Sequence, residues 1–182
     1  MKYTDKDGQH RGEYKKTENK VAMVSPTGEP VEILFDTTEA WATPKEMQEL
    51  VEWTQQAFLE KEIHPLLIIG NFVVEFLHIH PFEDGNGRLS RVLTNLLLLQ
   101  HRYEYVPYVS HEKIVEENKI DYYLALRNSQ KTFRSEVEDL SYWMTFFIGV
   151  LHTQVQQALE LISETEVSKL LSPQQQKVWE YL

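Results

Sequence analysis

The sequence predicts a mainly α-helical bundle with one small β-hairpin near the N-terminus, and two observations support this fold class. Most of the chain after residue 43 carries apolar residues at helical spacing, in segments that begin at capping or proline signals. Before them, the short apolar segments VAMV and VEIL flank a turn rich in proline and glycine. With 182 residues and 42% apolar content, the chain is long enough to bury one sizeable core.

The first elements follow directly from these signals. Residues 1–19 form a polar arm with no periodic apolar pattern, and residues 20–38 contain the hairpin. Thr43 is expected to cap the first long helix, with Pro44 in its first turn and Glu46 closing a capping box.

The middle of the chain predicts a pair of helices separated by a polar loop. The segment that opens at Pro65 is apolar nearly all round, as in a helix surrounded by others, and a second apolar helix is expected over 87–100. A short extended connection at 103–109 follows, and further helices are expected over 112–129 and from 135 to about 164.

The last residues indicate the start of another unit. Ser172 followed by proline is a helix-start signal near the end of the sequence, so we expect more protein downstream. The main domain is therefore expected over residues 20–165, and residues 166–182 begin a further helical segment, with a winged helix as one interpretation.

Composition excludes several classes of function. A formal charge of −10 argues against a general nucleic-acid coat, which needs a basic surface. The chain has no cysteine, which excludes disulfides, zinc–thiolate sites and cysteine catalysis. The N-terminus lacks the apolar core of a signal peptide, and the longest apolar stretch, residues 66–79, is too short to span a bilayer. We therefore expect a soluble cytoplasmic protein.

The segment HPFEDGNGRLSR, residues 80–91, carries the chemistry. A helix start presents unpaired N–H groups and a positive dipole end, and glycines there let a phosphate approach the backbone. Arg88 and Arg91 share one helical face and can each grip phosphate oxygens as a fork. Asp84 offers hard oxygens suited to Mg²⁺, and His80 can accept a proton at neutral pH. Together they indicate phosphate transfer from a metal-bound nucleotide.

Each of these features has a simpler structural explanation when taken singly. A lone histidine, glycine turn or arginine pair more often serves packing, a helix start or a solvated surface. Their concentration in one segment favours a site, because a structural turn needs one glycine and no paired guanidinium groups. Pro81 also keeps the backbone of His80 out of the helix, which a packing role does not explain.

The segment HPFEDGNGR followed by LSR resembles the Fic motif, HxFx(D/E)GNGRxxR, at every specified position. HPLLIIGNFVVEFLHI and RVLTNLLLL are similar to the helices before and after that motif, and VPYVS and NKIDYYLALRNSQ to sequence further downstream. The resemblance covers roughly residues 11–150. It implies a mostly helical Fic fold and, for most members, transfer of AMP from ATP to a protein Ser, Thr or Tyr hydroxyl.

The motif residues receive roles on this basis. His80 is expected to be the general base, a role that the resemblance also assigns, and Asp84 to hold Mg²⁺ between the α- and β-phosphates. Arg88 and Arg91 are expected to reach the β- and γ-phosphates. Backbone N–H groups, with the Asn86 side chain as a further donor, are expected to cradle phosphate oxygens at Gly85, Asn86 and Gly87.

Outside the motif the assignments rest on resemblance. Tyr122, Tyr123 and Gln130 match positions that line the adenine and ribose pocket of related Fic proteins, although packing of both tyrosines into the core is an equal alternative. The hairpin resembles the Fic flap, which binds the target as an added strand. Its site residues are Leu34, Phe35, Asp36 and Thr37.

A common regulatory motif of the family is absent. Fic proteins are often restrained by a helix bearing (S/T)xxxE(G/N), whose glutamate pairs with the second motif arginine, here Arg91. Glu18 and Glu117 are each followed by asparagine, but Tyr14 and Lys113 stand where Ser or Thr is required. We therefore expect an inhibitory helix upstream, one supplied by a partner, or an unrestrained enzyme.

The leading hypothesis is a protein adenylyltransferase that uses ATP and Mg²⁺ and also modifies itself. Its expected partners are ATP and a protein target held by the flap, with no membrane or nucleic acid, and a homodimer is left open. Another nucleotide or a phosphocholine donor, or a kinase-like orientation of the nucleotide, is an alternative within the fold. From another class, the alternative is an ATP-sensing interaction protein or a transcription regulator.

Overall fold

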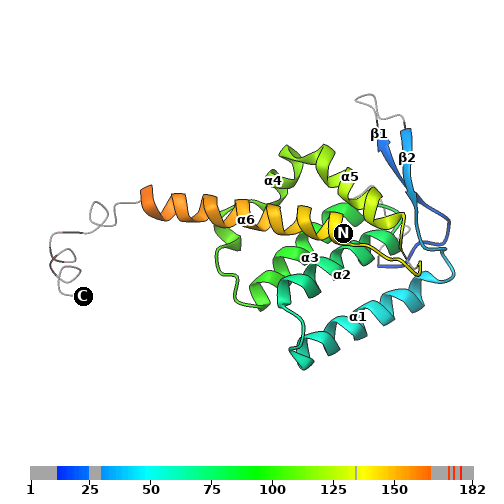
Figure 1. Ribbon diagram of the computed structural model, residues 1–182, viewed down its shortest axis with the longest axis horizontal. Coiled ribbons are helices and arrows are strands. Elements are labelled where there is room, and N and C mark those ends of the chain that lie inside the picture. Colours follow the sequence, from blue (N-terminus) through cyan, green and yellow to red (C-terminus); the bar gives the residue numbers. More distant parts are fainter. Residues whose placement is uncertain are drawn as a thin grey trace.

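The structure, a computed structural model, describes residues 12–24, 30–133 and 135–164, together with the isolated residues 172, 174 and 177. Within these residues the chain is mainly helical, as the sequence predicts (Figure 1). The expected hairpin turn at 25–29 and most of the expected segment 166–182 lie outside the described residues.

The helices form one compact body. They are α1 Thr43–Glu60, α2 Pro65–Ile79, α3 Asn86–Gln100, α4 His111–Glu117, α5 Lys119–Gln130 and α6 Ser141–Glu164. A short 3₁₀ helix, η2 Val106–Tyr108, lies between α3 and α4, so the extended connection that the sequence predicts there is wrong. Among the described residues, no helix combines the length and apolar character that crossing a membrane requires.

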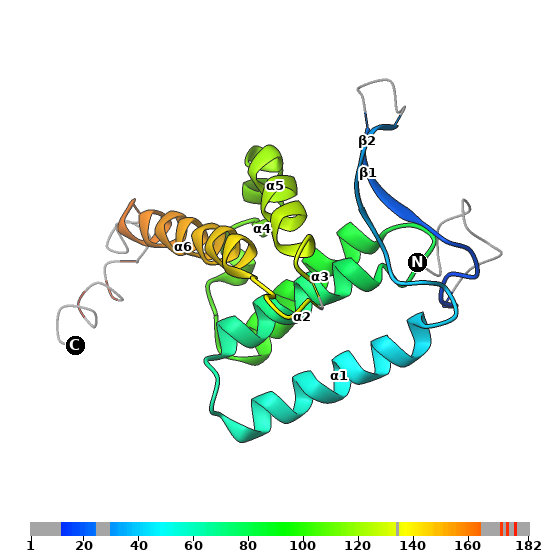
Figure 2. The same cartoon turned by 45° about the vertical axis from the view of Figure 1, so that its right-hand side comes forward.

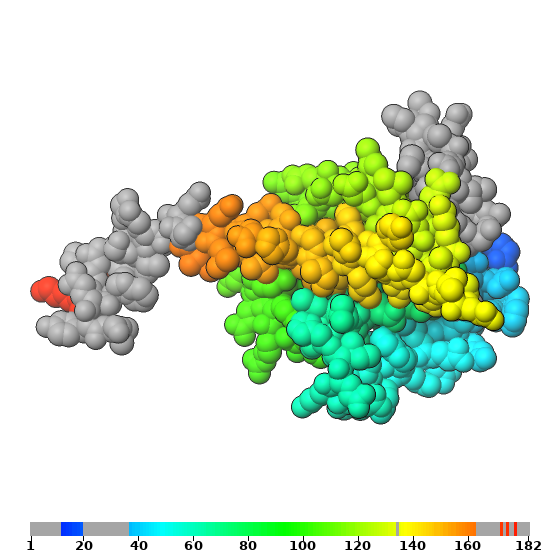
Figure 3. Space-filling view, viewed as in Figure 1, coloured from blue at the N-terminus to red at the C-terminus, as the bar shows by residue number. Residues whose placement is uncertain are grey.

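α2 is the central helix because nearly all of its faces are apolar and buried. It packs against α1, α3 and α6 (Figure 2). One of these neighbours, α6, crosses the molecule as a ridge in the space-filling view (Figure 3). Trp143 of α6 donates its indole N–H to the carbonyl of Gly70 at 2.7 Å. A β-carbon at Gly70 would lie only 2.8 Å from the sulfur of Met144, so any larger residue there would displace this side chain.

Two strands stand beside the helical body. β1 Lys20–Val24 pairs antiparallel with β2 Pro30–Asp36, and the register shifts twice along the pair. β2 contacts α5 and leads directly to α1 through residues 37–42 (Figures 1 and 2). The end of β2 therefore lies on the side of the body where α2 also ends.

The start of α1 differs from the capping box that the sequence predicts. Ala42 occupies the N-cap position and makes no side-chain cap, while the Thr43 hydroxyl donates to the Glu39 carbonyl at 3.0 Å. Glu46 instead accepts a hydrogen bond from the Thr38 hydroxyl at 2.6 Å. The side chains thus tie α1 to the segment after β2 and do not cap the helix.

The predicted helix over residues 112–129 is two helices, α4 and α5. They meet at Asn118, which has φ −112° and ψ 32° and donates its side-chain amide to the Ile114 carbonyl at 2.8 Å. The last long helix begins at Ser141 and not at residue 135. Asp139 donates its N–H to the Thr132 hydroxyl and accepts from the Ser141 N–H at 2.8 Å, which closes a turn before α6.

Candidate functional site

His80 ends α2 in a conformation that exposes one ring nitrogen for chemistry. Its backbone is left-handed, with φ 51° and ψ 58°, and its N–H donates to the Phe76 carbonyl at 3.0 Å. Ring Nδ1 lies 3.2 Å from the Leu77 carbonyl oxygen, which can only accept a hydrogen bond. The proton of the neutral ring is therefore on Nδ1, and Nε2 keeps a lone pair able to accept a proton.

The environment keeps this ring neutral. Burial lowers the pKa of His80 below its usual value of 6.5, and the positive charge of Lys15 acts in the same direction. The Leu77 carbonyl and the Asp84 carboxylate oppose this shift, without reversing it. A neutral imidazole at physiological pH is the form that a general base needs.

The loop after His80 is closed by Asn86. Its side chain is only 1% exposed: Oδ1 accepts from the Phe82 N–H at 2.9 Å, and Nδ2 donates to the Phe82 carbonyl at 2.6 Å. Both polar atoms therefore make hydrogen bonds inside the loop, and these bonds use one of the two N–H groups of the side-chain amide. Donation from the Asn86 side chain to a phosphate stays a prediction.

The start of α3 presents the groups that the sequence predicts for anion binding. Gly85 precedes the helix at φ 85°, a left-handed conformation that favours glycine. Its N–H donates to Asp84 Oδ1 at 2.6 Å, and Asp84 Oδ2 pairs with Arg88 Nη2 at 2.9 Å. Both side chains of that pair are exposed, so this edge of the helix is open to a ligand.

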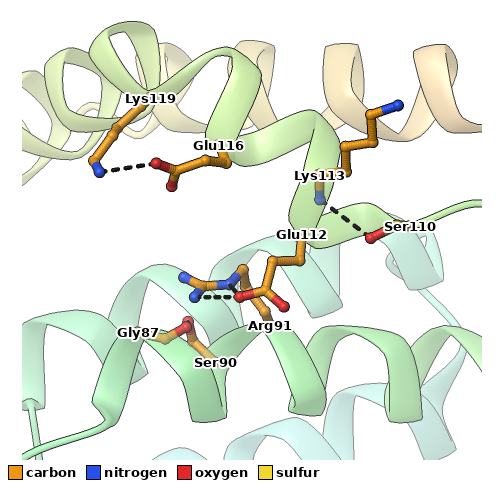
Figure 4. Close-up of polar contacts among 8 residues, drawn as sticks. All are labelled: Gly87, Ser90, Arg91, Ser110, Glu112, Lys113, Glu116 and Lys119. Carbon is orange, nitrogen blue, oxygen red and sulfur yellow. Dashed lines mark hydrogen bonds and ion pairs between the residues drawn. The ribbon is translucent and has the colours of Figure 1, made fainter.

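Arg91, the second motif arginine, is also paired with a carboxylate. Its Nε and Nη2 donate to Glu112 Oε1 at 3.2 and 2.8 Å (Figure 4). Glu112 lies in the first turn of α4, which Ser110 caps by accepting from the Lys113 N–H. No local sequence pattern indicates this pair, because an acidic residue in the first turn of a capped helix is ordinarily explained by the helix dipole.

Arg91 also acts electrostatically on two neighbours, His111 and Lys119. His111, next to Glu112, is buried, and burial lowers its pKa to about 4, so it is neutral at physiological pH. Arg91 and His111 line a cavity of about 10 Å³ together with Tyr122, so α3, α4 and α5 meet there. Glu112 therefore supplies the negative charge that balances Arg91.

The predicted pocket residues of α5 fall into different environments. Tyr122 is buried against Trp143 and Phe146, which fits the alternative of a core aromatic, whereas Tyr123 is half-buried with its ring edge against Tyr122. Gln130 is buried at the end of α5, and within the described residues neither its amide oxygen nor its nitrogen has a hydrogen-bond partner.

The predicted flap residues are partly described. The side chains of Leu34, Phe35 and Asp36 lie outside the described part of the structure. Thr37, which follows β2, uses its hydroxyl within the protein: it accepts from Lys15 Nζ at 3.0 Å and donates to Asn19. Its side chain is thus directed toward the N-terminal arm.

The arm itself contacts the motif, although the sequence predicts only a polar segment without pattern. The N–H of Lys15 donates to the Pro81 carbonyl at 2.8 Å, and the Asn19 amide donates to the His80 carbonyl at 3.2 Å. The ring of Tyr14 lies 5.8 Å from that of Phe82, centroid to centroid. The arm therefore packs against the motif through Tyr14, Lys15 and Asn19.

The donor set fits a magnesium ion that arrives with a nucleotide. Among the described residues, no three His, Cys, Asp or Glu side chains are grouped to hold a metal by themselves. Asp84 offers one exposed carboxylate. Magnesium in nucleotide sites is usually bound by one or two carboxylates together with phosphate oxygens and water, and Asp84 matches that pattern.

Comparison with known proteins places this site in a family. The family model described as Fic/DOC matches residues 2–98, more than half of the chain. The chain therefore belongs to the Fic/DOC family.

Relatives and solved structures agree. The chain is 34% identical over 110 residues to a protein named protein adenylyltransferase Fic from Aedes aegypti, covering 54% of this chain and 19% of that protein. The protein of the same name from Culex quinquefasciatus is 33% identical over the same share. The chain thus spans about a fifth of the length of these curated relatives.

Among solved structures, a Fic family protein from Desulfovibrio desulfuricans has a TM-score of 0.68 and 27% identity, covering 82% of this chain and 41% of that one. A Fic domain containing signaling protein from Bacteroides thetaiotaomicron has a TM-score of 0.66 and 28% identity, covering 85% and 56%. The helical arrangement is therefore the Fic fold.

The role of Asn86 can be tested by stability. Replacing Asn86 with Ala should lower the free energy of unfolding by about 1–3 kcal/mol, because the partly buried Phe82 N–H loses its partner. Urea denaturation measures this change. The matched control, Asn128→Ala on the partly exposed surface of α5, should change stability by less than about 0.5 kcal/mol. Equal effects of the two substitutions would show that Asn86 does not close the loop.

Proposed function

We propose that this protein is an adenylyltransferase, which moves AMP from Mg²⁺-bound ATP to a Ser, Thr or Tyr hydroxyl of a protein, itself included. One observation carries this proposal: a short loop connects the neutral imidazole of His80 to a helix start that bears two guanidinium groups. His80 Nε2 is free to accept a proton, and Arg88 and Arg91 each hold a carboxylate where a phosphate can bind. The names of the curated relatives support the same activity.

The chemistry assigned to His80 is a proton transfer. The oxygen of the target hydroxyl attacks the α-phosphorus, and its proton passes to His80 Nε2. A new phosphorus–oxygen bond forms, the bond from the α-phosphorus to the bridging oxygen of the β-phosphate breaks, and pyrophosphate leaves. Magnesium held at Asp84 would offset the negative charge of the phosphates when bound.

The two arginines can exchange their present partners for phosphate at small cost. Arg88 and Asp84 are both exposed, and in the other pair Glu112 is 66% exposed and Arg91 24%. Exposed ion pairs contribute only about 0–1 kcal/mol, whereas phosphate offers a guanidinium stronger, bidentate hydrogen bonds. Release of Arg88 also frees the Asp84 carboxylate for the metal.

The adenine and the target are assigned to neighbouring places. Gln130 has a buried amide without a partner among the described residues, and such a group is suited to the polar edge of a base. β2 contacts α5, so a target strand added to β2 would lie beside this pocket. Strand addition uses main-chain hydrogen bonds, which would present a hydroxyl without reading much sequence.

Transfer of label from ATP tests the proposed activity. With magnesium and ATP labelled on the α-phosphate, the wild-type protein should label itself or a target, and the intact mass should rise by one AMP. His80→Ala should abolish transfer while ATP still binds, because the phosphate contacts lie outside the imidazole. Tight binding of ATP by the wild type without transfer would instead indicate a sensor.

Removal of the Glu112 charge should improve ATP binding. In Glu112→Gln the guanidinium of Arg91 no longer has to leave an ion pair, so the Kd for ATP should fall about 2- to 5-fold. Calorimetric titration measures this. The matched control is Glu116→Gln on the same helix, whose carboxylate pairs with Lys119 and should leave the Kd unchanged (Figure 4). Weaker binding in Glu112→Gln would contradict the assignment of Arg91 to phosphate.

The pH dependence should follow His80. Its pKa is lowered by burial and by Lys15, against the Leu77 carbonyl and Asp84, so the ring stays neutral at pH 6.5 and becomes protonated only below it. The acid limb of kcat/KM, which reports the free enzyme, should therefore lie below pH 6.5. An acid limb of kcat/KM above pH 6.5 in the wild-type protein would contradict the assignment of His80 as the base.

A further inference from the structure

The backbone carbonyls around His80 are met by donors from the N-terminal arm. A helix end leaves its last carbonyls without helical partners, and a left-handed residue followed by proline adds more. Four successive carbonyls accept from two arm residues: Ile79 from Lys15 Nζ at 2.9 Å, His80 from Asn19 Nδ2 at 3.2 Å, Pro81 from the Lys15 N–H at 2.8 Å, and Phe82 from Asn19 Nδ2 at 3.0 Å. The arm therefore holds the backbone on both sides of the ring.

The ammonium group of Lys15 is the centre of this arrangement. The residue is 3% exposed, and each of its three donors has an acceptor: Asn19 Oδ1 at 2.9 Å, Thr37 Oγ1 at 3.0 Å and the Ile79 carbonyl at 2.9 Å. A buried cation is costly unless it is fully hydrogen-bonded and balanced. Here the negative end of the α2 dipole supports it. Burial lowers the pKa of Lys15, and nearby carboxylates oppose that shift: Glu18, Glu46, Glu83 and Glu39.

His80 needs such support because its conformation is unfavourable. A left-handed residue other than glycine costs about 1–2 kcal/mol. The helix itself holds the N–H of His80, through the Phe76 carbonyl, and ring Nδ1, through the Leu77 carbonyl. The carbonyl of His80 and the one before it are fixed by Asn19 and Lys15. These bonds set the direction in which the side chain leaves the backbone.

The same ammonium group reaches the end of β2. Thr37 follows β2 directly, and its hydroxyl binds Lys15 Nζ and both oxygens of Asn19. The N–H of Thr38 also donates to the His78 carbonyl at 3.2 Å. These bonds thus connect β2, which we assign to target binding, with His80, which we assign to accept the proton of the target hydroxyl.

We propose that Lys15 and Asn19 are positioning residues, which hold the His80 imidazole in register with the strand that presents the target hydroxyl. Neither residue contacts the reacting atoms in this arrangement, so both act through His80 and Thr37. The inference rests on the proposed transfer of AMP, since it concerns the geometry of that step.

Two substitutions separate positioning from phosphate binding. Lys15→Met removes the ammonium donors but keeps the backbone bond to Pro81. Asn19→Asp keeps an acceptor for Lys15 but removes the amide donor to His80 and Phe82. In both, kcat for AMP transfer should fall about 10- to 100-fold, as expected of a misplaced catalytic group. The KM for ATP should stay within about twofold, because the start of α3 is unchanged.

The matched control is Lys16→Met, one residue further along the arm. The Lys16 side chain is exposed and pairs only with Glu13 among the interactions described, so kcat and KM should both stay at wild-type values. A loss of kcat in Lys16→Met equal to that in Lys15→Met would overturn the inference. A rise in KM with unchanged kcat in the two test variants would overturn it as well.

A spectroscopic measurement decides the question without relying on activity. Nitrogen-15 NMR of the His80 ring, assigned with His80→Ala, should show a single Nδ1–H tautomer in the wild type and a mixture of tautomers in Lys15→Met and Asn19→Asp. An unchanged single tautomer in both variants would contradict the positioning role. Thermal melting identifies a variant that fails to fold, in which case the other variant decides. Absence of AMP transfer in the wild type would refute the proposed function alone, because the NMR result stands separately.

Discussion

The site depends on where α2 stops. The helix is buried among α1, α3 and α6, and Trp143 and Gly70 fix how closely α6 crosses it, so its axis has little freedom. Its last turn delivers His80 in a left-handed conformation, and Pro81 prevents the helix from continuing. The buried amide of Asn86 then closes the loop and starts α3. A hydrophobic core therefore determines the position of one imidazole relative to one helix start.

Each arginine at the start of α3 is paired with a carboxylate that a phosphate could replace. The chain carries a formal charge of −10, yet the proposed function requires a site that attracts a polyanion. Arg88 and Arg91 achieve this locally, and each is held in place by an exposed carboxylate, Asp84 or Glu112. The carboxylates keep the guanidinium groups oriented and are weak enough to yield to phosphate. Glu112 comes from α4, a different element from the inhibitory helix that the family resemblance implies, so the arginine is balanced without that motif.

The sequence predicted those parts of the molecule that depend on local patterns. α2 and α3 have strong apolar periodicity and clear boundaries, and the motif segment carries His80, Asp84 and both arginines within twelve residues. The breaks at Asn118 and before Ser141 were missed, because single side chains there bind the backbone in place of helical bonds.

Long-range partners were missed for a different reason. Lys15 and Ile79 are 64 positions apart, and Arg91 and Glu112 are 21 apart, and no local pattern links such residues. The arm was expected to be polar and without pattern, and its polarity is what allows it to satisfy the carbonyls around His80. A buried lysine cannot be distinguished from a solvated one by sequence alone, since both read as a charged residue in a polar segment.

The central claim is that a nucleoside triphosphate binds at the start of α3 with its α-phosphorus facing His80. A crystal structure with magnesium and a non-hydrolysable ATP analogue tests it most directly. The account predicts phosphate oxygens on the guanidinium of Arg91, with Glu112 displaced, and the α-phosphorus in line with His80 Nε2. A nucleotide bound elsewhere, with the Arg91–Glu112 pair intact, would contradict it.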